Sequence, residues 1–265
     1  MKKLMKNKKL IIGMIHFPPL PGSPEFKDDS NLSNIIKSVT EDLESLQTNG
    51  IDAIMFGNEG DRPYTLKASD ESLSTMAYVI GIIRNKIQIP FGVNYLWDPV
   101  ATVALGCITN ANFAREVFTG VYDSDMGLWQ PNAAKALRLR ANLKNTNLKL
   151  MFNVNAEFAS PLGNRSTSEK AESAVFSSLA DAICVSGVIT GKAVNIIDLT
   201  ETKNRVNPVP VFANTGVNIN NIEEILKVSD GCVIGSSLKY DGVTWNNIDP
   251  ERVSKFMQKV NNIRN

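Results

Sequence analysis

Short apolar segments alternate with amphipathic segments along the whole chain, and this alternation constrains the fold more than any other feature. Most of the short segments are apolar throughout, which is typical of parallel strands that are covered on both faces. We predict eight strands, at residues 9–15, 52–56, 90–94, 111–117, 148–154, 181–185, 209–213 and 231–234. A loop and a helical pattern follow them, so the sequence indicates repeated strand–helix units around a parallel sheet.

The intervening segments carry apolar residues at helical spacing. After the first strand, Ile35, Val39, Leu43 and Leu46 fall on one face of a helix, and Gly50 follows as a stop signal. Further helices are predicted at residues 72–84, 133–143, 169–179, 222–228 and 250–263, with less regular patterns at 99–106 and 194–205.

The chain length suits one closed arrangement of such units. A (β/α)8 TIM barrel typically needs about 250 residues, and this chain has 265. No low-complexity linker or shift in composition marks a second domain, so we predict a single α/β barrel domain over residues 1–265. A doubly wound open sheet is the alternative, but it usually needs fewer strands, and the first strand–helix loop is not a GxGxxG turn.

Charge and cysteine usage exclude several kinds of partner. With 28 basic and 27 acidic side chains the net charge is +1, which gives no general reason to expect a nucleic-acid or anionic-membrane partner. Cys107, Cys184 and Cys232 form no CxxC motif and His16 is the single histidine, so we expect structural thiols and no zinc site.

No apolar run approaches the roughly 20 residues of a membrane span or resembles a signal peptide, and we expect a cytoplasmic protein.

Polar side chains gather where the predicted strands end, and active sites of barrels lie at the C-terminal ends of their strands. The imidazole of His16 suits proton transfer, and partial burial would raise the pKa of Glu157 toward that of a general base. Alternatively, His16 bonds to strand-end backbone and Glu157 pairs with a nearby arginine. The candidates for acid–base catalysis are His16, Glu157, Asp61 and Asp98, and those for substrate binding are Asn58, Asn94, Arg115 and Asn153.

The loops after the last three predicted strands are rich in glycine and hydroxyl side chains. Glycines let backbone N–H groups approach an anion, and barrels often bind phosphate in the loops after the seventh and eighth strands. Alternatively, these glycines only form the turns that commonly connect strands and helices. The candidate phosphate-binding residues are Gly187, Thr190, Gly191, Thr215, Gly216, Gly235, Ser236 and Ser237.

The sequence requires no cofactor, but its early loops contain several carboxylates. Asp61, Asp98, Glu116, Asp123 and Asp125 could together hold Mg²⁺, which favours carboxylates, waters and substrate phosphate. The simpler interpretation is that these side chains are solvated or cap helices.

Four segments resemble the BtpA/SgcQ family, and together they span nearly the whole chain. They are residues 13–24 (GMIHFPPLPGSP), 52–55 with 60–63 (DAIM, GDRP), 119–122 with 125–127 (TGVY, DMG) and 230–242 (DGCVIGSSLKYDG). Asn153, Glu157 and Phe158 stand where the BtpA branch usually has an Asp and a Lys-His pair. These departures, with the Trp-Asp-Pro of residues 97–99, resemble the SgcQ-like branch instead.

The resemblance implies a barrel similar to ribulose-phosphate-binding barrels. The BtpA branch is associated with photosystem I biogenesis, whereas the SgcQ-like branch is associated with sugar-uptake operons and labelled a nucleosidase. Neither label supplies an established reaction. Because the residues at the fifth strand differ, we do not extend the photosystem role to this chain.

Two functions follow as hypotheses. The first is an enzyme that acts on a phosphorylated sugar or nucleoside-like small molecule by general acid–base chemistry, either hydrolysing an N-glycosidic bond or catalysing isomerisation or aldol-type cleavage. The second is a non-catalytic binding or assembly factor of the BtpA type that keeps the barrel and its pocket. Both bind a small molecule rather than nucleic acid or membrane, and a homo-oligomer is compatible with either.

Overall fold

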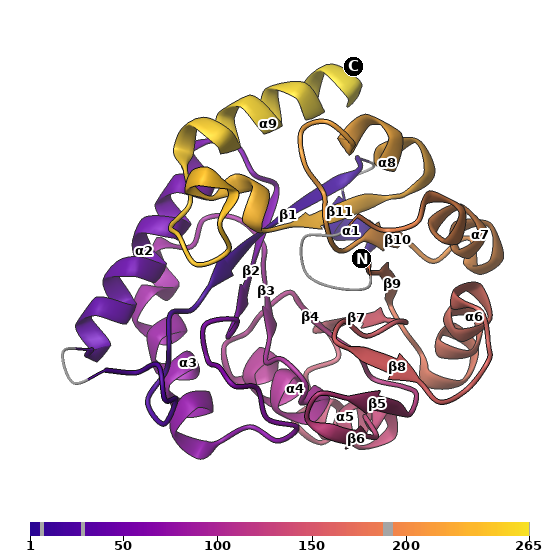
Figure 1. Ribbon diagram of the computed structural model, residues 1–265, viewed down its shortest axis with the longest axis horizontal. Helices are drawn as coiled ribbons and strands as arrows, with labels where there is room; N and C mark the ends of the chain where they lie inside the picture. The colour runs from indigo at the N-terminus through magenta and orange to yellow at the C-terminus, as the bar shows by residue number, and fades with distance from the viewer. Residues whose placement is uncertain (6–7, 28–29, 188–192, 265) are drawn as a thin grey trace.

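Eight parallel strands close into a barrel in the computed structural model, which describes residues 1–5, 8–27, 30–187 and 193–264 (Figure 1). The barrel strands are β1 (Leu10–His16), β2 (Ala53–Gly57), β3 (Phe91–Asn94), β4 (Phe113–Glu116), β7 (Lys149–Asn153), β9 (Ala182–Val185), β10 (Val211–Ala213) and β11 (Gly231–Ile234). Each strand pairs with the barrel strands before and after it in the chain, and β11 pairs with β1. The predicted (β/α)8 TIM barrel is confirmed, and the open doubly wound sheet is wrong.

Helices surround this barrel on its outer side (Figure 1). They are α2 (Leu32–Thr48), α3 (Asp70–Ile83), α4 (Pro99–Ile108), α5 (Ala133–Asn142), α6 (Thr167–Ser178), α7 (Ile196–Val206), α8 (Ile222–Val228) and α9 (Pro250–Arg264). Polar caps set where they begin: the Asn31 side chain accepts a hydrogen bond from the backbone N of Asn34 at 2.9 Å, and Ser166 and Glu169 form a capping box. Among the helices of the described residues, none joins the length and the apolar character that a membrane crossing requires.

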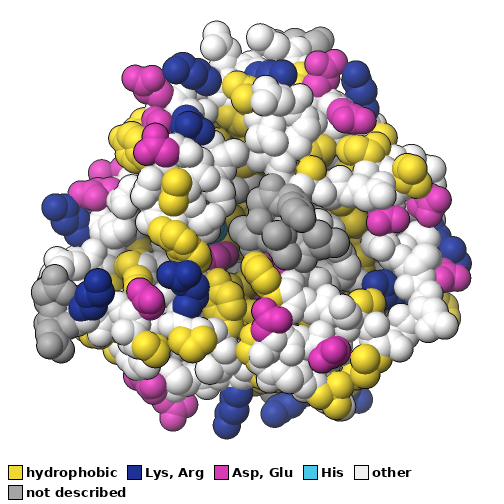
Figure 2. Space-filling view, viewed as in Figure 1, with side chains coloured by type: hydrophobic (Ala, Val, Ile, Leu, Met, Phe, Trp, Pro, Cys, Tyr) yellow, Lys and Arg dark blue, Asp and Glu magenta, His cyan; other side chains and the backbone are white. Residues whose placement is uncertain are grey.

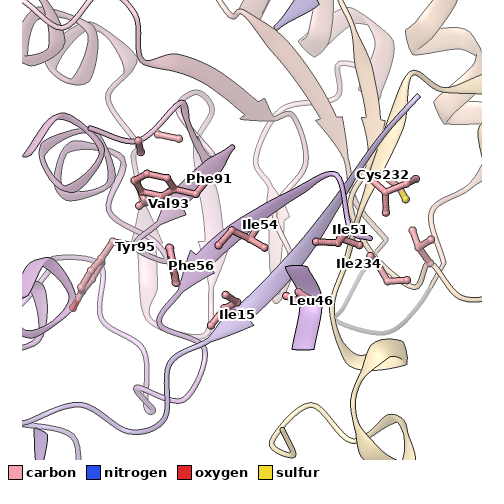
Figure 3. Packing of buried hydrophobic residues seen from close by; sticks show 14 of the residues in the cluster. Ile15, Leu46, Ile51, Ile54, Phe56, Phe91, Val93, Tyr95, Cys232 and Ile234 are labelled. Carbon is pink, nitrogen blue, oxygen red and sulfur yellow. The ribbon is translucent and has the colours of Figure 1, made fainter. Parts of the chain in front are cut away.

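The main core lies between the barrel and the helices (Figure 3). Ile15, Ile54 and Phe56 project outward from β1 and β2, and Leu46 of α2 belongs to the same buried cluster. Burying each such side chain contributes about 1.5–3 kcal/mol, so this layer fixes where the helices sit. The three cysteines are buried and unpaired in the described chain, as the sequence predicts for structural thiols.

A second apolar cluster fills the barrel interior. Its inward-facing members include Met14, Phe113, Met151 and Phe212, and Met1 beside the short helix α1 (Lys2–Met5) also belongs to it. Side chains on a strand alternate between its two faces, so the residue two places further along each strand also faces inward. At that next level the side chains are polar: His16, Asn94, Arg115, Asn153 and Asn214. An apolar barrel interior therefore ends in a polar floor at the C-terminal ends of the strands.

A small antiparallel sheet, which we did not predict, lies beside the barrel. It consists of β5 (Tyr122–Ser124), β6 (Gly127–Trp129) and β8 (Ala159–Pro161). Strands of three residues are too short to show periodicity. The register pairs Tyr122 with Trp129, and both side chains are buried. The sheet thereby adds an aromatic wall to the mouth of the barrel.

Candidate active site

A cavity of about 310 Å³ opens at the C-terminal ends of the barrel strands. Figure 2 looks onto this end of the molecule, where hydrophobic side chains gather toward the middle of the face and most charged side chains lie around its periphery. The predicted site residues that line the cavity are His16, Asn94, Arg115, Asn153, Glu157, Thr215, Gly216, Gly235, Ser236 and Ser237. Residues from the ends of four strands (β1, β3, β4 and β7) and from the loops after β7, β10 and β11 thus converge on one cavity.

Arg115 is the central cation of the polar floor. Its Nη1 donates to Oδ1 of Asn214 at 3.0 Å, and its Nη2 donates to Oδ1 of Asn94. Asn94 in turn donates from Nδ2 to Oε2 of Glu116 at 2.6 Å. All four side chains are buried, so the network holds the guanidinium in one position without solvent.

Glu116 serves as the anchor of this network, and the sequence suggested it only as one of several loop carboxylates. Its Oε2 also accepts from the backbone N of Trp97 at 3.1 Å, and its Oε1 accepts from the backbone N of Val117 at 2.7 Å. Burial raises the pKa of Glu116 to about 7, while the charge of Arg115 opposes that rise. With its oxygens engaged by donors, Glu116 is suited to position Arg115 and the loop of Trp97.

His16 and Glu59 form a second polar pair at the cavity. The imidazole Nε2 lies 3.6 Å from Oε1 of Glu59, and the two side chains are 7% and 13% exposed. Burial raises the pKa of Glu59 to about 7, and burial together with the charge of Lys239 holds the pKa of His16 well below its usual value. Near neutral pH a neutral imidazole therefore lies beside a carboxyl group that is close to its own midpoint.

Glu59 is not among the residues that the sequence predicts for the site. The neighbouring Asn58 and Asp61, which follow the same predicted strand, were expected there instead. Glu59 is two residues beyond Gly57, the last residue of β2. Its place two residues after an inward-facing strand end is the one signal that could have identified it.

Four buried polar atoms of residues that line the cavity have no hydrogen-bond partner among the described residues. They are Nδ1 of His16, Oε2 of Glu59, Nε of Arg115 and Oδ1 of Asn153. Leaving such an atom without a partner costs about 1–3 kcal/mol, so a ligand or water that completes the bonds is favoured. When His16 is neutral with its proton on Nε2, three of the four atoms accept and one donates. The unmet bonding capacity therefore matches a ligand that is rich in hydroxyl groups.

Aromatic rings form one wall of the cavity. The ring centroids of Trp97 and Trp129 are 4.7 Å apart, and those of Tyr64 and Trp97 are 6.5 Å apart. Tyr122 supports Trp129 from behind at 5.5 Å. Trp97 itself has a positive φ of 72° and is held by its bond to Glu116. This wall offers an apolar face beside the polar floor.

The loops after β10 and β11 form another side of the cavity. Thr215 Oγ1 accepts from the backbone N of Gly187, so Gly187 supports Thr215 from outside the lining. The Ser237 hydroxyl donates to the carbonyl of Val217 at 2.7 Å, and the Ser236 hydroxyl bonds to that of Thr244 at 2.7 Å. The remaining two phosphate-binding candidates, Thr190 and Gly191, lie outside the described residues.

Besides Gly187, three other described residues predicted for the site are not part of the cavity lining. Asp98 caps α4, because its Oδ1 accepts from the backbone N of Val100 and Ala101 at 3.0 and 2.9 Å. Its Oδ2 accepts from the backbone N of Ala68 at 3.1 Å, so both oxygens have a structural role, and the catalytic role expected for Asp98 stays a prediction. Asn58 accepts from the backbone N of Leu96 at 2.8 Å, and Asp61 lies with Asn58 in a smaller neighbouring pocket.

The carboxylates suggested for Mg²⁺ are spread over different parts of the molecule. Asp98 caps a helix, Glu116 anchors the polar floor, and Asp123 belongs to the small sheet. Within the described ranges, no three His, Cys, Asp or Glu side chains come together in a way that could hold a metal ion.

A closed parallel barrel with a buried polar floor defines a TIM-barrel protein, and its cavity lies at the C-terminal strand ends, where such barrels usually have their active site. The family model described as the BtpA family matches residues 7–262, and the chain belongs to that family.

Two relatives indicate to which branch of this family the chain is more similar. The sgc region protein SgcQ of Escherichia coli is 42% identical over 264 residues, covering 100% of this chain and 98% of that protein. The photosystem I biogenesis protein BtpA of Synechocystis is 32% identical over 253 residues, covering 94% of this chain and 87% of that protein. The higher identity to SgcQ confirms the predicted branch. Among solved structures, thiamine phosphate pyrophosphorylase of Pyrococcus furiosus has the same fold, with a TM-score of 0.58 at 17% identity over 98% of this chain and 100% of that one.

Proposed function

We propose that this protein is an enzyme that acts on a phosphorylated sugar or a nucleoside-like small molecule by general acid–base chemistry. The observation that carries the proposal is the pair of His16 and Glu59 in one cavity whose lining residues carry buried acceptor atoms without a partner among the described residues. A neutral base and a carboxyl with a pKa of about 7 are the groups that can exchange protons at neutral pH.

The cavity suits a ring that carries hydroxyl groups. Its volume of about 310 Å³ is at the small end of ligand pockets. Among the lining residues, Asn153 and Glu59 each have a buried acceptor oxygen without a partner in the described chain, and Arg115 has such a donor, so a small shift of these side chains would let them bond to hydroxyl groups. The rings of Trp97 and Trp129 supply an apolar face against which the C–H side of a sugar or a flat base can pack.

Glu59 is the residue we assign to proton transfer. When protonated it can donate to a departing oxygen or nitrogen, and when ionised it can activate a water or remove a proton from the substrate. Arg115, fixed by Asn94 and Asn214, can stabilise negative charge that develops on the substrate. Hydrolysis of an N-glycosidic bond and isomerisation both require this change in the protonation of Glu59.

A ligand screen tests the proposal. Thermal-shift measurements with ribose, ribose 5-phosphate, nucleosides and nucleoside 5′-phosphates should show stabilisation by at least one hydroxylated compound, and Asn153→Ala should reduce that shift. Turnover of the stabilising compound should follow in a product assay. Stabilisation without turnover by the wild-type protein would indicate the non-catalytic binding role instead, and no shift with any compound would contradict the cavity assignment.

A further inference from the structure

Arg252, in the first turn of α9, lies on the rim of the cavity. It lines the cavity together with Gly216, Ser236, Ser237 and Gly242, which carry no charge. The acidic side chains of the lining come from other elements: Glu59 follows β2, Glu116 ends β4, and Glu157 lies between β7 and β8. The side of the cavity formed by β10, β11 and α9 is therefore its cationic side.

Among the described residues, the guanidinium of Arg252 makes only long contacts. Nη1 lies 3.4 Å from the carbonyl oxygen of Ser237, and Nε lies 3.5 Å from Oδ2 of Asp249. The other oxygen of Asp249 accepts from the backbone N of Glu251 at 2.9 Å and of Arg252 at 3.3 Å, so this carboxylate is engaged in starting the helix. A guanidinium has five N–H donors, and most of those of Arg252 remain available to a ligand.

The position of this charge also points to an anionic ligand. A cation in the first turn of a helix is unfavourable, because the N-terminal end of the helix carries partial positive charge. Asp249, at 3.5 Å from Nε of Arg252, offsets part of this cost, whereas Glu251 pairs with Lys255 at 3.3 Å on the exposed side of α9. An anion bound between Arg252 and the loops would convert this unfavourable placement into a favourable one.

The neighbouring loops leave room for such an anion and add a donor. Gly216 and Gly242 have φ values of 62° and 71°, which other residues rarely adopt, and a Cβ on Gly242 would lie 3.8 Å from Nη1 of Arg252. The hydroxyl oxygen of Thr215 accepts from Gly187, which leaves its proton free to point toward the cavity.

We propose that Arg252 selects a phosphomonoester by binding its terminal oxygens through charge-assisted N–H bonds, with Thr215 donating a further bond. The inference rests on the proposed function and deepens it, since it identifies the residue that distinguishes a phosphorylated ligand from its neutral counterpart. It also fixes the ligand's direction: the phosphate lies beside α9, and the hydroxylated part lies over Asn153 and Glu59.

Calorimetric titration of the full chain with inorganic phosphate, ribose and ribose 5-phosphate tests this assignment. The wild-type protein should bind ribose 5-phosphate at least 10-fold more tightly than ribose, and Arg252→Gln should remove that preference. Arg252→Lys keeps the positive charge but lacks the planar guanidinium with its paired N–H donors. Its preference for ribose 5-phosphate over ribose should therefore lie between those of the wild type and Arg252→Gln. Lys255→Gln, one turn along the exposed side of the same helix, is the matched control and should bind like the wild type. Circular dichroism of each variant checks that the fold is retained.

Equal affinity of wild-type protein and folded Arg252→Gln for ribose 5-phosphate would overturn the inference, and so would a wild-type protein with no preference for the phosphorylated sugar. These outcomes are distinct from failure of the acid–base proposal. A protein that binds the phosphate through Arg252 but turns over no compound supports the inference while contradicting the proposed catalysis.

Discussion

Nε2 of His16 lies 3.6 Å from Oε1 of Glu59, yet the two groups do not form a conventional ion pair. Burial disfavours the charged form of each: it lowers the pKa of His16 well below its usual value and raises that of Glu59 to about 7. A neutral pair that can gain or lose a proton near pH 7 is better suited to proton exchange with a ligand than to stabilising the fold.

The raised pKa of Glu59 predicts how stability depends on pH. In the unfolded chain Glu59 ionises near its ordinary value of 4.5, whereas in the folded protein it ionises near 7. Between these values the folded state binds more protons, so the free energy of unfolding falls as pH rises and then levels off above pH 7. Glu59→Gln should therefore be more stable than the wild type at pH 8 by about 1–3 kcal/mol, in urea unfolding experiments.

The advantage of Glu59→Gln should shrink as the pH falls toward 4.5. The matched control is Glu44→Gln, which alters an exposed carboxylate on α2 that pairs with Lys86 at 3.5 Å. It should show little change at either pH. A Glu59→Gln variant that is less stable than the wild type at pH 8 would mean that Glu59 is an ionised, structurally paired group.

Arg115 should be the residue on which the polar floor depends for stability. Arg115→Met leaves Glu116 buried without its neighbouring cation, and Asn94 and Asn214 each lose a donor. We expect a loss of about 3 kcal/mol in the free energy of unfolding at pH 7 to 8. Arg138→Met, which removes an exposed arginine with one 3.3 Å bond to its own helix, should change stability by no more than about 0.5 kcal/mol.

Asp98 should contribute to the stability of α4 and not to the affinity for a ligand. Asp98→Ala removes both cap bonds of α4 and should lower stability by about 1–2 kcal/mol, whereas Asp98→Asn should retain most of it. Neither variant should change the affinity for a sugar phosphate by more than about twofold, measured by calorimetry at a temperature where both are folded. A 100-fold loss of turnover in folded Asp98→Asn would restore the catalytic role.

Gly235 should control the position of His16. A Cβ at residue 235 would lie 3.2 Å from both Cε1 and Nε2 of the imidazole, so Gly235→Ala should displace the ring and weaken ligand binding about 10-fold. Gly163→Ala is the control, because a Cβ there meets no atom within 4 Å. Identical affinities in the two variants would show that ligand binding does not need this placement of His16.

The barrel could be predicted because the alternation of short apolar segments with amphipathic helical segments repeats along the whole chain. Most strands are largely apolar and most helices show a clear helical spacing of apolar residues, so an error of two residues at one boundary does not change the predicted topology. The segment predicted at residues 111–117, for example, is the shorter β4, Phe113–Glu116. The small sheet was missed because three residues are too few to carry a period.

The candidate site was predicted only in part, because beyond the end of a strand the sequence no longer indicates to which side a side chain points. Asn94, Arg115 and Asn153 lie within strands, and alternation places them on the polar floor. Glu59 lies in a loop, where continuing the alternation from Gly57 gives only a weak indication that Glu59 and not Asn58 faces the cavity. Asp98 precedes a proline, and a carboxylate there is equally a helix cap. Arg252 belongs to a helix whose contact with the cavity depends on closure of the barrel.

The pH dependence of turnover in wild-type protein and Glu59→Gln tests the central claim most directly, with the compound that gives the largest thermal shift as substrate. We expect the kcat/KM of the wild-type protein to change with an ionisation near pH 7. Glu59→Gln should lack this ionisation and turn the compound over at least 100-fold more slowly, while it still binds the compound. Turnover by Glu59→Gln at the wild-type rate, with the same pH profile, would contradict the account.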